Sequence, residues 1–174
     1  MAKGTDAGRL GELNELIQDI EIAMLTTRRP DGRLVSRPMA TQKPQPDADL
    51  WFVTDRDAHK LDEIAAEPQV NVAYYNNQTR EWVSVSGRAR ISHDRARIRE
   101  LYQPDWKIWF PDEGGERDGG PDDPRLTLLL IDVESAVYAV STKSRAGALV
   151  EMAKSFATGG EPDILRTEKI GAAG

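Results

Sequence analysis

The stretch Leu50–Ala66, LWFVTDRDAHKLDEIAA, places a short apolar strand directly before a helix. An unbroken run of apolar residues is typical of a strand buried on both faces. His59 and Lys60 fall in the first turn of the predicted helix. Two potentially cationic side chains beside the unpaired N–H groups of a helix start suit an anion such as phosphate. The alternative is that both are ordinary solvated surface residues.

The boundaries of this helix follow from local signals. The spacing of Thr54 and Asp57 matches a capping box, with Asp55 or Asp57 as an alternative cap. Pro68 cannot continue a helix, so the sequence predicts a helix over residues 57–67.

The chain on either side predicts strands joined by tight turns, which pair antiparallel. A turn signal, Arg29-Pro30-Asp31-Gly32, separates two strand patterns and indicates a hairpin. We expect a mainly β fold, a six-stranded antiparallel barrel with peripheral helices, because strands and helices do not alternate as in a doubly wound sheet. The predicted strands are 22–27, 33–42, 50–54, 70–75, 81–92 and 125–140, and the other predicted helices are 9–20, 94–102 and 147–156.

The length of 174 residues suits one domain, which we place at residues 9–158, after a flexible N-terminus at 1–8 and before a tail at 159–174. A Gly/Asp/Pro-rich loop at 111–124 is expected to be mobile.

Composition excludes several kinds of function. The chain has no cysteine, which rules out disulfides, thiolate zinc sites and cysteine nucleophiles, and its two histidines argue against a histidine-rich metal site. A net charge of -6 argues against a general nucleic-acid binder. The sequence shows no long apolar run or secretory signal, so we expect a cytoplasmic protein without a membrane span. General enzyme motifs are missing, and we predict no dedicated catalytic acid or base.

Arg37 on the second strand needs a partner, because it shares a mainly apolar face with Val35 and Met39. A phosphate is one candidate, and a carboxylate is the other. The carboxylates considered are Asp55, Asp57 and Glu81. Pro38 cannot donate to a strand ladder, which places it at an edge or a bulge.

The strand 81–92 alternates between apolar and polar residues. One face carries Val83 and Val85, and the other carries Trp82, Ser84 and Ser86. The second face is ordinarily solvated. Gly87 marks a bulge or a close approach of another group.

Trp106 and Trp109, next to the glycine-rich loop, have the spacing of one helical face. They serve either as packing or as the wall of a pocket for a flat ring.

Three segments together resemble the pyridoxamine 5′-phosphate oxidase-like flavoproteins, and within them the general stress protein 26 group. They are MLTTRRPDGRLVSRPMA at 24–40, LWFVTDRDAHKLDEIAAEPQVNVAY at 50–74 and EWVSVSGRARI at 81–91. The resemblance implies a split β-barrel and a homodimer that binds FMN, with FAD as a further possibility, at the subunit interface. It implies these cofactor-binding residues: Arg37, Pro38 and Met39 along the flavin, Val53 and Thr54 at the end of the third strand, His59 and Lys60 at the phosphate, Trp82, Ser84 and Ser86 near the ring, and Trp106 and Trp109 covering the ring from the other subunit.

The chain also departs from the oxidases of this family. They often carry Arg-Lys where this chain has His59-Lys60, so we expect phosphate binding that is weaker or pH-dependent. Their paired C-terminal arginines are not recognisable, since only Arg145 and Arg166 follow Val140. Oxidation of pyridoxamine phosphate is therefore not expected.

The resemblance implies a flavin-dependent oxidoreductase or flavin reductase with small-molecule electron donors and acceptors. A flavin-binding stress protein without turnover is the alternative. An enzyme using the deazaflavin F420 and a module without a ligand are two further readings.

Overall fold

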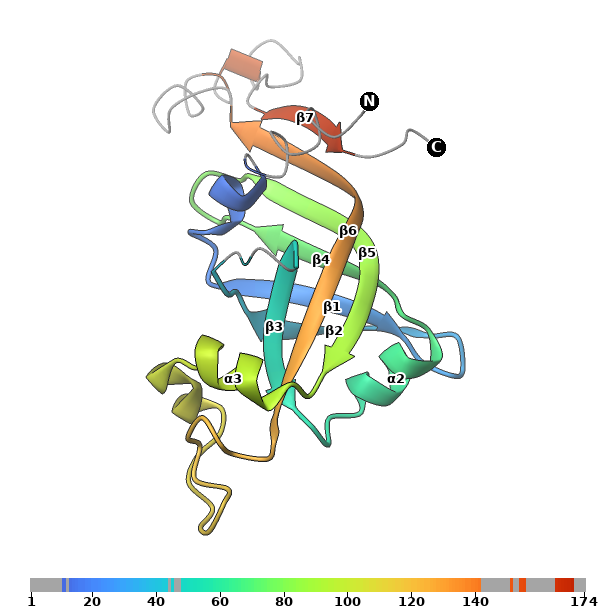
Figure 1. Cartoon of the computed structure of the whole chain (residues 1–174). Helices are drawn as coiled ribbons and strands as arrows, with labels where there is room; N and C mark the ends of the chain where they lie inside the picture. Colours follow the sequence, from blue (N-terminus) through green and yellow to red (C-terminus); the bar gives the residue numbers. More distant parts are fainter. Residues whose placement is uncertain are drawn as a thin grey trace, which may run out of the picture.

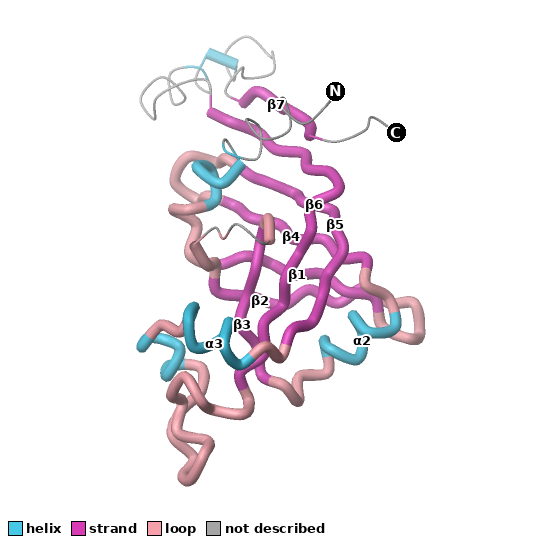
Figure 2. The backbone as a smooth tube through the Cα atoms, in the orientation of Figure 1, coloured by secondary structure: helices cyan, strands magenta, loops and turns pink. Residues whose placement is uncertain are grey.

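The computed structural model describes residues 11, 13–43, 45, 48–141, 151, 154–155 and 165–170. Figure 1 shows a strongly curved antiparallel sheet with short helices around it, and Figure 2 shows that strands dominate the backbone. Residues 13–17 are helical. The strands are β1 (Ile22–Arg28), β2 (Leu34–Ala40), β3 (Leu50–Asp55), β4 (Gln69–Tyr75), β5 (Trp82–Ser92), β6 (Leu126–Ser141) and β7 (Leu165–Ile170); the helices are α2 (Lys60–Ala66), α3 (Arg95–Leu101) and the 3-10 helix η1 (Pro104–Ile108).

The strand order is β2-β1-β4-β5-β6-β3, and β7 pairs with β6. This confirms the mainly β, antiparallel class, with seven strands in place of the predicted six. The additional strand, β7, lies inside the range 159–174 that was expected to be a tail. The predicted flexible N-terminus at 1–8 lies outside the described residues, and so does most of the predicted helix 147–156.

Gly87 is where the sheet bends. The pairing of β5 with β6 shifts register between Ser86 and Gly87, which is a β-bulge. A Cβ atom on Gly87 would collide with the carbonyl oxygen of Asp132. The predicted bulge and close approach are therefore both confirmed, and they let the long strands curl around the core.

Two hydrophobic cores pack against opposite faces of β3. Leu50 and Phe52 belong to the core enclosed by the curved sheet. Trp51 belongs to a second core shared with α3 and η1, and Val53 packs against it. The apolar run in the sequence thus predicted burial on both faces correctly.

Helix α2 begins later than predicted, at Lys60. Its N-cap residue, His59, makes no capping bond through its side chain. The expected capping box is wrong because Thr54 belongs to β3 and its hydroxyl accepts a hydrogen bond from Lys60. Asp55 instead accepts a bond from the backbone N–H of Asp57, at 2.8 Å, in the turn before the helix.

Within the described ranges, no helix is both long enough and apolar enough to span a membrane. The same part of the chain holds no cluster of three metal-ligating side chains.

Candidate functional site

The two strands at the ends of the sheet order, β2 and β3, each pair with one neighbour among the described strands. A cavity of about 200 Å³, which we call the seam cavity, is lined by residues of both strands. Edge strands present backbone N–H and C=O groups that no ladder uses, and such groups suit the polar edge of a heterocycle. The lining residues are Ile22, Pro38, Met39, Ala40, Val53, Thr54, Asp55, Lys60, Trp109 and Phe110.

Six of the predicted site residues meet in this seam cavity: Pro38, Met39, Val53, Thr54, Lys60 and Trp109. Sequence reasoning missed Ile22, Ala40, Asp55 and Phe110. The hairpin register supplies a signal for two of them, because Ile22 pairs with Ala40. The other two directly follow the predicted residues Thr54 and Trp109.

Lys60 lies at the boundary between the seam cavity and an open hollow, since its side chain lines both. Its ammonium group donates a hydrogen bond to the Thr54 hydroxyl at 2.6 Å. Partial burial and the nearby positive charge of Arg37 lower the pKa of Lys60, against the opposing pull of Asp55 and Glu63. No carboxylate of the described residues forms an ion pair with this ammonium, which leaves its charge available to an anion.

Positively charged side chains gather around the hollow. Arg29, Arg37 and Lys60 line it with His59, against the carboxylates of Asp62 and Glu63; Pro30 and Val35 complete the lining. The structure therefore brings together three of the predicted residues, Arg37, His59 and Lys60. This arrangement can hold an anion next to the apolar seam cavity.

Arg37 already has a carboxylate partner in this chain. Its Nη2 lies 2.8 Å from Glu63 Oε2, and its Nη1 donates to Thr27 Oγ1 at 2.6 Å. Thr27 in turn donates to the same Glu63 oxygen at 2.6 Å, which closes a ring of three hydrogen bonds. Sequence analysis considered Asp55, Asp57 and Glu81 as partners and did not consider Glu63. The contribution of Arg37 to phosphate binding remains a prediction.

Burial alone would raise the pKa of the Glu63 carboxyl group. The hydrogen bonds from Thr27 and Arg37, together with the positive charge of Arg37, outweigh burial and hold this pKa below its ordinary value. Glu63 therefore keeps its negative charge and offsets part of the positive charge in the hollow.

Trp106 and Trp109 lie in different environments. Trp106 is 2% exposed and packs edge-on against Trp51 and Tyr102 in the second core. Trp109 follows the last residue of η1, is 63% exposed and lines the seam cavity of its own chain, whereas the resemblance implied that it comes from the other subunit. The predicted shared face does not form, because the 3-10 turn ends between them. Trp106 does not line the cavity of its own chain.

Trp82, Ser84 and Ser86 do not line the seam cavity of their own chain either. They occupy the face of β5 that points away from the enclosed core. Ser84 accepts a hydrogen bond from Asn71 Nδ2 at 2.9 Å, and Ser86 lines a separate hollow beside β1 and β4. Their contact with a flavin remains a prediction.

Comparison with known proteins assigns the fold to a family. The model of the family described as "Pyridoxamine 5'-phosphate oxidase like" matches residues 9–163. The chain belongs to this family. One relative, Protein bli-3 of Neurospora crassa, is 34% identical over 165 residues, which cover 93% of this chain and 79% of the relative.

Solved structures agree with the family assignment. A putative general stress protein 26 from Jannaschia sp. CCS1 matches with a TM-score of 0.72 and 25% identity, over 95% of this chain and 99% of the other. A pyridoxamine 5'-phosphate oxidase-related, FMN binding protein from Nostoc punctiforme PCC 73102 matches with a TM-score of 0.59 and 19% identity, over 99% and 98%. The resemblance to the general stress protein 26 group is thus confirmed, and the second match shows the shared fold.

Proposed function

We propose that the chain binds FMN, with the flavin ring in the seam cavity and the phosphate in the hollow. The observation that carries this proposal is the position of Lys60, which joins the two spaces. FMN combines a flat, largely apolar ring with a phosphate, and the site combines an apolar cavity with a cluster of cations. The FMN-binding structure of the same fold supports the proposal.

Both the hydrogen-bond donors and the positive charge of the site suit this cofactor. Lys60 is the main phosphate contact, because its charge is partly desolvated and its one hydrogen-bond partner among the described residues is the neutral Thr54. Arg37 adds positive charge, part of which is offset by its ion pair with Glu63. His59 lines the hollow without a capping role, and its side chain is exposed.

We further propose that a second copy of the chain completes the site. The seam cavity of about 200 Å³ is smaller than the range of about 300–1,000 Å³ that is common for small-molecule sites. Ile22 and Met24 are about two-fifths exposed and Tyr75 more than half, on the outer face of the sheet. Ile22 also lines the cavity, so a partner that covers this face would close the cavity as well.

The same arrangement would bring the β5 residues to the interface. Met24 pairs with Ala73, which pairs with Ser84, so Ser84 shares the outer face with Met24. Trp82 lies opposite Tyr75. A homodimer packed through this face would place these residues at the junction of the subunits, where the flavin of the partner would meet them.

Bound FMN supplies redox chemistry, and the residues of this chain bind, orient and shield it. The apolar part of the lining packs against the ring, the second copy closes the cavity to water, and Lys60 anchors the phosphate. We propose a flavin-dependent oxidoreductase or flavin reductase that acts on small molecules. A flavin-binding stress protein without turnover is the second candidate, and the similarity to a general stress protein 26 favours it.

The function is tested by purifying the protein and recording its visible absorbance. A flavin spectrum, with FMN identified by mass spectrometry of the released ligand, is the expected result. Released FAD or F420 would contradict the choice of cofactor, and a protein that neither copurifies with flavin nor binds added FMN would contradict the proposal. Oxidation of NADH or NADPH no faster than with free FMN would favour the stress protein without turnover.

A further inference from the structure

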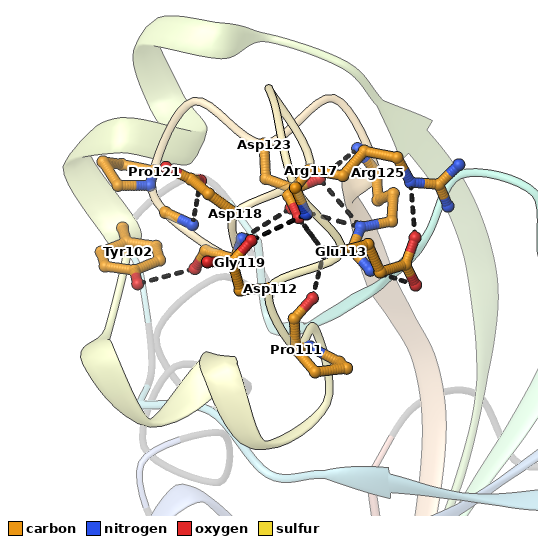
Figure 3. A network of polar contacts seen from close by, with 12 residues as sticks. Tyr102, Pro111, Asp112, Glu113, Arg117, Asp118, Gly119, Pro121, Asp123 and Arg125 are labelled. Carbon is orange, nitrogen blue, oxygen red and sulfur yellow. Dashed lines mark hydrogen bonds and ion pairs between the residues drawn. The ribbon is translucent and has the colours of Figure 1, made fainter.

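The loop between η1 and β6 is closed around a buried ion pair. The sequence predicted a mobile segment at 111–124, but Figure 3 shows its backbone wrapped around Asp123 and Arg125. Asp123 is fully buried and Arg125 is 4% exposed. Arg125 Nη2 lies 2.6 Å from Asp123 Oδ2, and Nε donates to Asp123 Oδ1 at 3.0 Å. This pair gives the loop a charged core in place of an apolar one.

Arg125 links the loop to the wall of the seam cavity. Its guanidinium group donates to the carbonyl oxygen of Pro111 at 2.8 Å and lies over the ring of Phe110, 5.8 Å from the ring centre. Its own carbonyl oxygen accepts a bond from the backbone N–H of Arg56 at 2.7 Å, directly after β3. One residue thus connects the end of β3 to Phe110, and both line the same cavity.

Gly119 lies against the same wall. Its N–H donates to Asp123 Oδ2 at 2.8 Å, and its carbonyl oxygen accepts a bond from the Tyr102 hydroxyl at 2.8 Å. Its φ of +71° is in the region that favours glycine, and a Cβ atom here would collide with the carbonyl oxygen of Phe110. The backbone of Phe110 is therefore packed directly against the loop.

We propose that the loop closed by the Asp123–Arg125 pair positions Trp109 and Phe110 as the fixed wall of the flavin-ring cavity. Asp123, Arg125 and Gly119 are then positioning residues, since none of them lines the cavity: Arg125 and Gly119 contact Phe110, and Asp123 holds both of them. This inference rests on the proposed function. It predicts that a disturbed loop weakens binding of the ring and leaves the phosphate contacts of Lys60 intact.

Two glycines of this loop provide a matched test. Gly119→Ala adds a methyl group against Phe110, whereas Gly115→Ala adds one at a similar positive φ of +63° with no atom within 4 Å. We would measure the dissociation constants of FMN and of riboflavin, which lacks the phosphate, for both variants. We expect Gly119→Ala to weaken both ligands by the same factor, about 10-fold for a loss near 1.4 kcal/mol, and Gly115→Ala to leave both unchanged.

Equal affinities in wild type and Gly119→Ala would overturn the inference. So would a loss that affects FMN alone, because that result would place the effect at the phosphate. A wild-type protein that binds neither ligand would instead refute the proposed function, and the loop is then tested without flavin.

That second test is hydrogen–deuterium exchange of the ligand-free protein, comparing wild type with Asp123→Asn and Glu113→Gln. Glu113 contacts Arg125 at the exposed rim, 2.9 Å from Nη1, and serves as the control. We expect faster exchange at residues 109–120 in Asp123→Asn, with the amides of β4 and β5 unaffected, and little change in Glu113→Gln. Unchanged exchange at 109–120 in a folded Asp123→Asn protein would overturn the inference. If Asp123→Asn does not fold, the same comparison of Gly119→Ala with Gly115→Ala decides the question.

Discussion

Arg37 and Glu63 form a largely buried ion pair that ties the β1–β2 hairpin to helix α2, with Nη2 and Oε2 2.8 Å apart. Thr27 on β1 bonds to both side chains. Helix α2 also carries Lys60. The ion pair therefore fixes the position of Lys60 relative to the hairpin, and with it the shape of the proposed phosphate hollow.

Replacement of Glu63 by glutamine should destabilise the protein. Arg37 would lose its charged acceptor, and hydrogen bonds to charged groups contribute about 2 kcal/mol. We expect urea unfolding at neutral pH to show a loss of this size in Glu63→Gln. Asp62→Asn, at the exposed neighbouring position, should change the unfolding free energy little.

The stability difference between wild type and Glu63→Gln should depend on pH. The pKa of Glu63 in the folded chain is below its ordinary value of 4.5, so its stabilising effect is present above that value. The effect is lost as the pH falls through the pKa of the folded state. The stability difference between wild type and Glu63→Gln should therefore shrink in acid, and a difference independent of pH would contradict the assignment.

As the pH rises, phosphate binding should weaken at a lower pH than it would with a lysine of ordinary pKa. Burial and Arg37 hold the pKa of Lys60 below its usual 10.5, so its charge is lost below that pH. We expect the ratio of FMN affinity to riboflavin affinity to fall as the pH rises toward 10.5. Titration of the flavin ring affects both ligands and cancels in this ratio. Lys60→Arg should keep the ratio constant over the same range, since arginine stays charged.

The proposed dimer makes a separate prediction. Met24→Asp and Tyr75→Asp each place a charge on the exposed apolar face of the sheet. A buried unpaired charge is costly, so both variants should shift the chain from dimer to monomer in sedimentation experiments. Ile108→Asp, at a still more exposed apolar residue on η1, is the control and should remain dimeric. Wild-type chain that sediments as a monomer would contradict the dimer.

Acid should also release the loop that holds the cavity wall. Burial would raise the pKa of Asp123, but its bonds from Arg125 and Gly119 lower it to about 2. The stabilising effect of this carboxylate is present above its ordinary value of 3.8 and is lost as the pH falls toward 2. Exchange protection of the loop should fall over this interval in wild type, while Asp123→Asn should show no such step.

The sequence predicted those parts of the fold that have a local signal. Alternation of apolar residues identified β4 and β5, and the apolar run at Leu50 identified a strand buried on both faces. Strand β7, with the sequence LRTEKI, has no apolar face to reveal it and depends on pairing with β6. Its detection requires the tertiary structure.

The candidate site also combines residues that a local sequence signal identifies with contacts that only the tertiary structure reveals. Lys60, Thr54, Pro38 and Met39 belong to short motifs, and the structure brings them together. The Arg37–Glu63 pair joins residues 26 positions apart on different elements, a separation at which no local pattern indicates contact. The opposite exposures of Trp106 and Trp109 depend on where a 3-10 turn ends, which helical spacing does not predict.

The most direct test of the central claim is the binding of FMN and riboflavin to wild type and to Lys60→Gln. Truncation of one partner of a buried charged contact costs about 2–5 kcal/mol, and of an exposed contact about 0–1 kcal/mol. For the half-buried Lys60 we predict FMN binding weakened about 10-fold or more, with riboflavin binding unchanged. Lys43→Gln, at an exposed lysine outside the site, should change neither. Unchanged FMN affinity in Lys60→Gln would contradict the account.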